Sequence, residues 1–140
     1  MTTRDYLLQL RTIDMDIEIR ESEAQSWRDL AAKMHHEPSD INIKVSPSQD
    51  KFENLVIKAA DCAMKADRER DCLLYTKRKI EDQIKCMTDK TNRWFVWVYY
   101  HDGRSLGSIG KEKNYTRQHV STLLRKAEKD FEKLYGDTYI

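Results

Sequence analysis

Two long series of heptad-spaced apolar residues are the feature that most restricts what this chain can fold into. One series runs from Tyr6 to Met34 and the other from Phe52 to Met87, and in both the steps alternate between four and three residues. Such spacing places each series along one side of a helix that packs on a partner. A single helix of this length is marginal in water. The pattern therefore predicts an all-α chain that begins with a long antiparallel helical hairpin, or coiled coil.

Both series are mostly apolar, but charged residues interrupt them. The first series consists of Tyr6, Leu10, Ile13, Ile17, Arg20, Ala24, Trp27, Ala31 and Met34. The second consists of Phe52, Val56, Ala59, Ala63, Ala66, Arg70, Leu73, Lys77, Ile80, Ile84 and Met87. The alanines allow the two helices to approach closely. Polar interruptions such as Arg20, Arg70 and Lys77 can fix the register of two helices at some cost in stability.

Residues 35–50 separate the two series and show no clear period. Their prolines, serines and aspartates predict a loop, which is longer than the roughly 2–8 residues usual between packed helices. A loop of this length would let two chains exchange helices, so a homodimer is one expectation. We expect Thr2 or Thr3 to cap the first helix, and Ser48 or Asp50 to cap the second.

Several other classes of protein leave signals that this sequence lacks. Cys62, Cys72 and Cys86 are odd in number and have neither disulfide nor zinc spacing, and the neighbouring His35 and His36 cannot face one metal on a helix. The sequence has no glycine-rich phosphate loop and no nucleophile with a matched base. It also has no signal peptide and no run of roughly 20 apolar residues. We expect a cytoplasmic protein without enzymatic activity, metal, cofactor or membrane span.

The C-terminal third combines a basic patch with the spacing of a helix-turn-helix motif. Residues 101–126 carry six lysines and arginines against two acidic residues. Gly110 supplies the small residue needed where the two helices of such a motif touch. Asn114, four positions later, tolerates the left-handed backbone of the turn. Thr116 is a good N-cap for the second helix, which we expect to open at Arg117.

The apolar residues after the turn continue at helical spacing and are expected to face the core. They are Val120, Leu123 or Leu124, Ala127, Phe131 and Leu134. We expect Tyr115 to be a buried residue of the turn. Gly136 lies where the helix should stop.

The polar residues that open the second helix would lie on its outer side, where DNA could be read. Arg can bind guanine through two hydrogen bonds, Gln can pair with adenine, and Ser or Thr can contact bases or phosphates. Nearby cations would hold phosphates. The candidate DNA-binding residues are Arg104, Lys111, Lys113, Thr116, Arg117, Gln118, His119, Ser121, Thr122 and Arg125, with Lys126 as a further phosphate contact. The alternative interpretation is two short amphipathic helices with a solvated polar face.

The aromatic run from Trp94 to Tyr100 is ambiguous by itself. Its aromatic and β-branched residues favour a strand, whereas its length also suits a buried helix. We therefore divide the chain into a hairpin at residues 1–88, including the loop at 35–50, and a motif-bearing domain at residues 89–140. The first region has a net charge of −2 and the second a net charge of +3.

The order of these parts resembles a known group. The carrying segments are YLLQLRTIDMDI near the start, SPSQDKFENLVIKAAD in the middle, and the run from Tyr99 through Gly110 to Val120. The sequence is similar to small regulators of phages and prophages of Gram-positive bacteria, related to the ArpU-like late-gene regulators. Their C-terminal part resembles region four of bacterial sigma factors. The resemblance implies that Trp94–Tyr100 is helical and that the C-terminal domain binds DNA.

Two functions of different classes follow as expectations. The first is a phage-encoded transcription regulator that reads promoter DNA, with double-stranded DNA and host RNA polymerase as partners. The second is a phage-encoded inhibitor or adaptor that binds a host machine, such as RNA polymerase or a defence nuclease of the CRISPR type. Three features motivate this alternative: the long hairpin, the aromatic-rich segment 94–100 and the weakened motif. In the motif, Lys113 stands in place of the usual apolar residue and Asn114 in place of the turn glycine. Exposure of Trp94, Trp97 or Tyr100 would favour it, and burial of all three would favour core packing.

Overall fold

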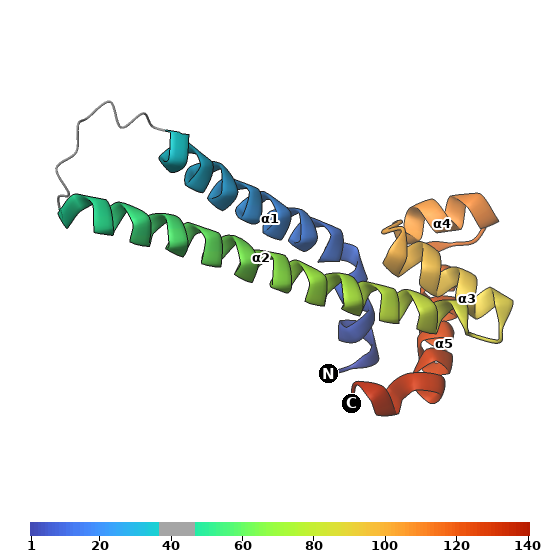
Figure 1. Cartoon of the computed structure of the whole chain (residues 1–140). Coiled ribbons are helices and arrows are strands. Elements are labelled where there is room, and N and C mark those ends of the chain that lie inside the picture. Colours follow the sequence, from blue (N-terminus) through green and yellow to red (C-terminus); the bar gives the residue numbers. More distant parts are fainter. Residues whose placement is uncertain (37–46) are drawn as a thin grey trace. The chain divides into compact units, whose positions relative to one another are not determined.

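The computed structural model describes residues 1–36 and 47–140, with side chains at 1–34 and 51–140, and the described residues contain helices and no strand. The elements are α1 (Thr3–His36), α2 (Pro47–Lys85), α3 (Lys90–Val96), the π-helix η1 (Trp97–His101), α4 (Leu106–Lys113), α5 (Arg117–Tyr135) and the 3₁₀-helix η2 (Gly136–Thr138). Figure 1 shows α1 and α2 running side by side in opposite directions. The predicted all-α class and the long hairpin are confirmed.

Contacts group the chain into two units. The hairpin unit is Met15–Leu74, and the motif unit combines Met1–Asp14 with Tyr75–Ile140. Both long helices contribute to both units. The domain boundary expected near residue 88 follows the order of the elements along the sequence, whereas these units follow contacts in space.

The hairpin unit packs along the predicted seam. Ala24 of α1 and Ala59, Ala63 and Ala66 of α2 are all buried. Small side chains at these positions let two helix backbones lie close together, because the distance between helix axes depends on the residues at the contact. The seam is less closed toward the loop end, where Trp27 is only half-buried.

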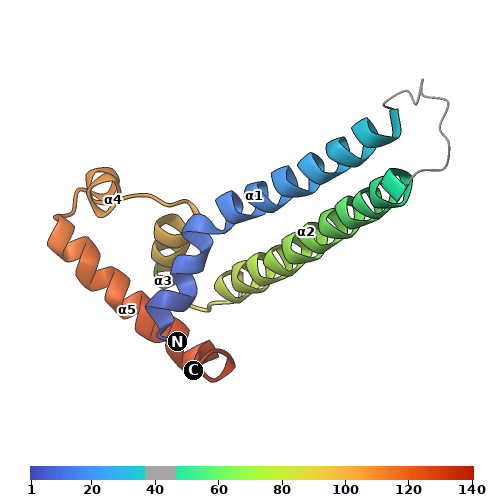
Figure 2. The ribbon, with the colours of Figure 1, turned by 90° about the vertical axis from the view of Figure 1, so that its left-hand side faces the viewer.

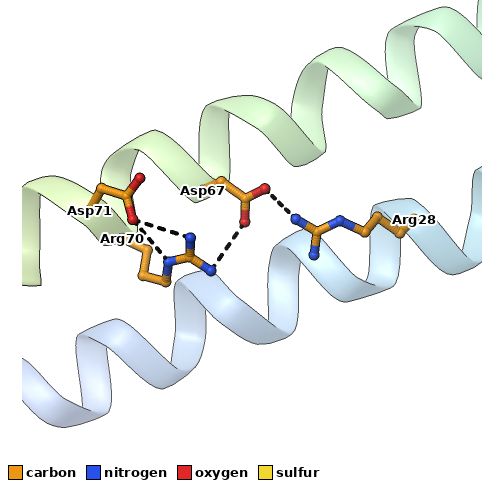
Figure 3. Close-up of polar contacts among 4 residues, drawn as sticks. All are labelled: Arg28, Asp67, Arg70 and Asp71. Carbon is orange, nitrogen blue, oxygen red and sulfur yellow. Dashed lines mark hydrogen bonds and ion pairs between the residues drawn. The ribbon is translucent and has the colours of Figure 1, made fainter.

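The charged interruptions of the seam form ion pairs between the two helices. Arg20 Nε lies 3.0 Å from a carboxylate oxygen of Glu69. Arg28 pairs with Asp67, whose buried Oδ1 receives no hydrogen bond in the described structure but lies 3.4 Å from Arg70 Nη1. Figure 3 shows the resulting chain of contacts, in which Arg70 also reaches the neighbouring Asp71. Small alanine side chains alone specify the register of two helices poorly, and these ion pairs add contacts that depend on the register.

The motif unit has a larger and more varied core. α5 packs against both α3 and α4, as the second view of the ribbon also shows (Figure 2). The largest fully buried side chains of this unit are Tyr100, Phe131, Leu7, Ile80, Ile84, Met87, Ile109, Val96 and Val120. Leu7 lies outside the predicted seam. It is buried because the first turns of α1 belong to this unit and pack on more than one face.

Hydrogen bonds hold the start of α1 within the motif unit. Arg11 donates from Nε to the Tyr99 carbonyl oxygen at 3.0 Å and from Nη2 to the Arg104 carbonyl oxygen at 2.9 Å. Tyr6 donates to Gln83 of α2 at 2.6 Å. Thr2 caps α1, because its Oγ1 accepts from the backbone N–H of Asp5 at 3.1 Å. The cap predicted at Thr2 or Thr3 is thereby resolved to Thr2.

Two predictions about the ends of the long helices need correction. Ser48 and Asp50 do not precede α2, because the helix already begins at Pro47. Proline suits the first helical position, where the backbone N–H that it lacks would have no partner within the helix. The predicted loop is also shorter than residues 35–50: His35 and His36 end α1, and its remaining part, residues 37–46, lies outside the described residues.

The segment Trp94–Tyr100 is helical, as the resemblance implies, so the strand alternative is wrong. Asp89 caps α3 by accepting from the backbone N–H groups of Thr91 and Asn92. The helix then widens into η1, in which the Asp102 N–H donates to the Trp97 carbonyl oxygen at 3.0 Å. Gly103 follows with a φ of +68°, a conformation that glycine adopts without strain.

Candidate nucleic-acid interface

The turn between α4 and α5 is built by three residues with separate tasks. Asn114 adopts the left-handed conformation, with φ 58° and ψ 39°. Thr116 Oγ1 accepts from the His119 N–H at 3.1 Å and caps α5. At Gly110, an added Cβ atom would lie 2.6 Å from the carbonyl oxygen of Tyr115, so no side chain fits there without displacing the backbone. The predicted tasks of all three residues are confirmed.

The core face of α5 agrees with the prediction at most positions. The buried residues of this face are Val120, Leu124, Ala127 and Phe131. Of the two alternatives Leu123 and Leu124, Leu124 is therefore the core residue. Leu134 is 45% exposed and does not continue the stripe. Phe131 instead contacts aromatic rings that follow it in the chain, including Tyr135 and Tyr139.

The prediction that Tyr115 is buried is wrong. Its side chain is 43% exposed, and its ring packs edge-on against the His119 ring at 4.7 Å between centroids. The physical reason lies at the crossing of the helices. The backbone carbonyl of Tyr115, not its ring, occupies the space beside Gly110. The two rings therefore form an exposed aromatic pair at the start of α5.

The candidate residues fall into those that build the motif and those that are free to contact a ligand. Arg104 is committed to α4, because it pairs with Glu112 and donates to the Ser108 carbonyl oxygen at 3.2 Å. Thr116 is committed to its cap, and Thr122 Oγ1 donates to the Gln118 carbonyl oxygen at 3.0 Å. Each of these three residues therefore has at least one polar atom that is already occupied within the motif.

Most of the other candidates are exposed. Lys111, Lys113, Arg117, Gln118, His119 and Arg125 lie at the surface, and Ser121 is half-buried. Within the described part of the chain, no carboxylate pairs with Lys111, Lys113, Arg117, Arg125 or Lys126. Cations without carboxylate partners are available for an external anion.

Charge is divided unequally between the two units. The motif unit carries 16 lysines and arginines against 11 acidic residues, a net charge of +5. The hairpin unit carries 9 against 13, a net charge of −4. The overall charge of +1 conceals this separation. A polyanion would be attracted to the unit that carries the helix-turn-helix arrangement.

Two cations contact rings of the aromatic segment, and the sequence predicted neither contact. Lys113 Nζ lies 4.5 Å from the centroid of the Trp94 ring, which places this lysine beside α3 as well as at the end of α4. Arg11 Cζ lies 4.2 Å from the centroid of Tyr99. The partners of each pair are far apart in sequence, so no spacing rule could have paired them. Cation–π contacts of this kind hold an exposed cation in place.

Tyr100 has a different role from its aromatic neighbours, because it is fully buried and donates to the Glu128 carboxylate. Burial, assisted by that carboxylate, raises the pKa of the Tyr100 hydroxyl well above its ordinary value. Trp94 and Trp97 are half-buried. The aromatic segment thus supplies one core residue and two rings that remain partly accessible.

The described residues contain neither a cluster of metal ligands nor a helix that could span a membrane. No group of three or more His, Cys, Asp or Glu side chains among them could hold a metal ion. None of the helices there is both long enough and apolar enough to cross a membrane. No protein-family model matches the chain, and comparisons with curated proteins and with solved structures also found no match.

Proposed function

We propose that this chain is a phage-encoded DNA-binding transcription regulator, and that the start of α5 reads promoter DNA. The observation that carries the proposal is the turn at Gly110, Asn114 and Thr116. It directs the next residues of α5 outward, on the unit that holds the excess of positive charge. A helix presented in this way fits the major groove of B-form DNA.

The exposed residues divide by their chemistry. Arg117 and Gln118 would contact base edges, because their side chains form paired hydrogen bonds with guanine and adenine. Lys111, Lys113 and Arg125 would contact phosphates, which set the affinity but carry no sequence information. The resemblance to small phage regulators with a part like sigma region four supports the same proposal.

The experiment is a titration of the purified full chain with DNA from around its own gene at two salt concentrations. We expect binding that weakens steeply with salt, with a slope of about −0.9 for each phosphate neutralised. The Arg117→Ala/Gln118→Ala variant should lose preference for that DNA. Arg68→Ala, an exposed arginine of the hairpin unit, is the matched control and should bind as the unaltered chain does. Failure of the unaltered chain to bind would reject the proposal.

The accessible tryptophans support a second candidate function, an inhibitor or adaptor that binds a host machine such as RNA polymerase or a defence nuclease. Trp94 and Trp97 are half-buried, and aromatic residues are frequent anchors of protein interfaces. Tyr100 gives no such support, since its burial assigns it to the core. Titration of labelled protein with purified host RNA polymerase tests this candidate. A Trp94→Ala variant that keeps its DNA binding but loses polymerase binding would favour it.

A further inference from the structure

The outer side of α1 in the hairpin unit carries an apolar stripe that the hairpin does not use. Met15 and Ile19 are each 58% exposed, and Leu30 is 38% exposed. Their spacing from the buried Ile17 and Ala24 places them on the opposite side of the same helix. Hairpin packing does not explain apolar residues at these positions, because the seam faces the other way.

The middle of this stripe is lined by small side chains. Ser22 and Ser26 lie between Ile19 and Leu30 on the same side of α1. Ser26 Oγ donates to the Ser22 carbonyl oxygen at 2.9 Å, so its hydroxyl is turned back onto its own helix. Small side chains flanked by larger apolar ones give a surface on which a second helix can approach closely. We call Met15, Ile19, Ser22, Ser26 and Leu30 the outer stripe.

Carboxylates border the outer stripe on both sides. Helical spacing places Asp16 and Glu23 along one edge and Glu18 and Asp29 along the other. Between residues 15 and 30 the sequence has five acidic residues and only two basic ones, Arg20 and Arg28, and the exposed Lys33 follows Leu30 by one turn, beyond the end of the stripe.

Both arginines are engaged across the hairpin. Arg20 pairs with Glu69 at 3.0 Å as well as with Glu23 at 3.1 Å, and Arg28 pairs with Asp67 (Figure 3). Among the described residues, Asp16, Glu18 and Asp29 have no cation within ion-pair distance. The border of the stripe is therefore negative and largely uncompensated.

We propose that the outer stripe binds an amphipathic helix of another protein, one whose apolar side is flanked by lysines and arginines. The apolar residues supply an area to bury, and the carboxylate borders select the charge of the partner. A second copy of this chain is a poor occupant, because two outer stripes facing each other would bring carboxylates against carboxylates. The inference goes beyond DNA binding and does not depend on it.

The test uses a fluorescent synthetic peptide of roughly four heptads with leucine at the a and d positions and lysine at the e and g positions. A second peptide with glutamate at e and g serves as the charge control. Anisotropy titrations with the full chain should show the lysine peptide binding at least about tenfold more tightly than the glutamate peptide. Raising the salt concentration should reduce that ratio.

Two double variants of the full chain locate the binding surface. Ile19→Ser/Leu30→Ser should weaken binding of the lysine peptide at least about tenfold, because burial of each apolar side chain stabilises the complex. Ile57→Ser/Met64→Ser removes two residues of α2 that are 59% and 52% exposed, and should leave binding unchanged. Circular dichroism must first show that both variants retain the helix content and melting temperature of the unaltered chain.

Three results would overturn the proposal: equal binding of the two peptides, equal losses in the two double variants, or no binding by the unaltered chain. Sedimentation velocity measures the oligomeric state of the unaltered chain and of the variant. A dimer that becomes a monomer in Ile19→Ser/Leu30→Ser would assign the outer stripe to a second copy instead. DNA titration of the same variant separates the two proposals, since we expect its DNA binding to be unchanged.

Discussion

The hairpin unit and the motif unit are made of the same type of element but differ in what fills them. Along the hairpin, the buried residues include Ala24, Ala59, Ala63 and Ala66, and ion pairs between exposed or half-exposed groups join the two helices. In the motif unit, Tyr100, Phe131 and large aliphatic residues are fully buried, and side-chain caps close the helix ends. We therefore expect much of the stability to reside in the motif unit, whereas the hairpin unit is a long helix pair with few large buried side chains.

The largest expected difference comes from removing a large core side chain. Phe131→Ala in the motif unit should reduce the free energy of unfolding by about 3–5 kcal/mol, because it leaves a cavity among packed aromatic rings. Trp27→Ala in the hairpin unit should cost less, since that side chain is only half-buried. Urea denaturation followed by circular dichroism measures both. A larger loss for Trp27→Ala would reverse the comparison.

Alkaline pH should act next, through the buried tyrosines of the motif unit. All seven tyrosines lie in that unit, and burial raises the pKa of Tyr6, Tyr100 and Tyr139. A pKa that is raised on folding stabilises the fold fully below the unfolded value, near pH 10. This stabilisation is lost as the pH rises toward the folded value. Thermal melts between pH 8 and about 11 should therefore show the melting temperature falling only above about pH 10.

Tyr100→Phe is the variant for that experiment. It should flatten the alkaline loss, although it also removes the hydrogen bond to Glu128 and lowers stability at neutral pH. Hydrogen exchange at high pH localises the opening. A loss of exchange protection on raising the pH that is greater in α2 near Ala63 than in α5 would contradict the assignment of the alkaline loss to the motif unit.

Two glycines of α4 give a matched pair of smaller opposite effects. Gly110→Ala should destabilise the fold by about 1–3 kcal/mol, because the new Cβ would clash with the Tyr115 carbonyl oxygen. At Gly107 an added Cβ meets only Ser105 Oγ at 4.0 Å, so Gly107→Ala should stabilise by about 0.5–1 kcal/mol. Thermal denaturation of both variants checks the sign. Equal effects would show that the crossing of α4 and α5 is not closely packed.

The smallest expected effect concerns the ion pairs of the hairpin unit. Asp67→Asn removes the charge that Arg28 and Arg70 share, but these side chains remain partly exposed. We expect a loss below about 1 kcal/mol, which diminishes in high salt. Denaturation at two salt concentrations measures it. A loss far above that size, unaffected by salt, would mean that register in the hairpin depends on buried charge.

The parts of the fold that could be predicted are those determined locally. Heptad spacing identifies both long helices, since periodicity directly reflects the buried side of a helix. The turn is predictable for the same reason, because Gly110, Asn114 and Thr116 act within a few residues of one another. The start of α2 could not be placed to the residue, because Ser48, Asp50 and Pro47 all favour a helix N-terminus.

The errors arise where the outcome depends on which group fills a given space, and the order of residues does not record that. Tyr115 is exposed because its own carbonyl fills the space beside Gly110, and no pattern distinguishes a carbonyl from a ring. Leu134 is exposed, whereas the Phe131 ring packs on Tyr135 and Tyr139 near the end of the chain. The contact between Lys113 and Trp94 joins two helices and has no signature in the order of residues.

The turn between α4 and α5 has one consequence for how such a protein could change over generations. The residues that hold its shape, Gly110, Asn114 and Thr116, are engaged with the backbone, whereas Arg117 and Gln118 form no side-chain hydrogen bond or ion pair within the described structure. Mutation can therefore exchange the outward residues one at a time while the scaffold stays intact. A lineage carrying this turn could drift from one target to another without passing through an unfolded ancestor.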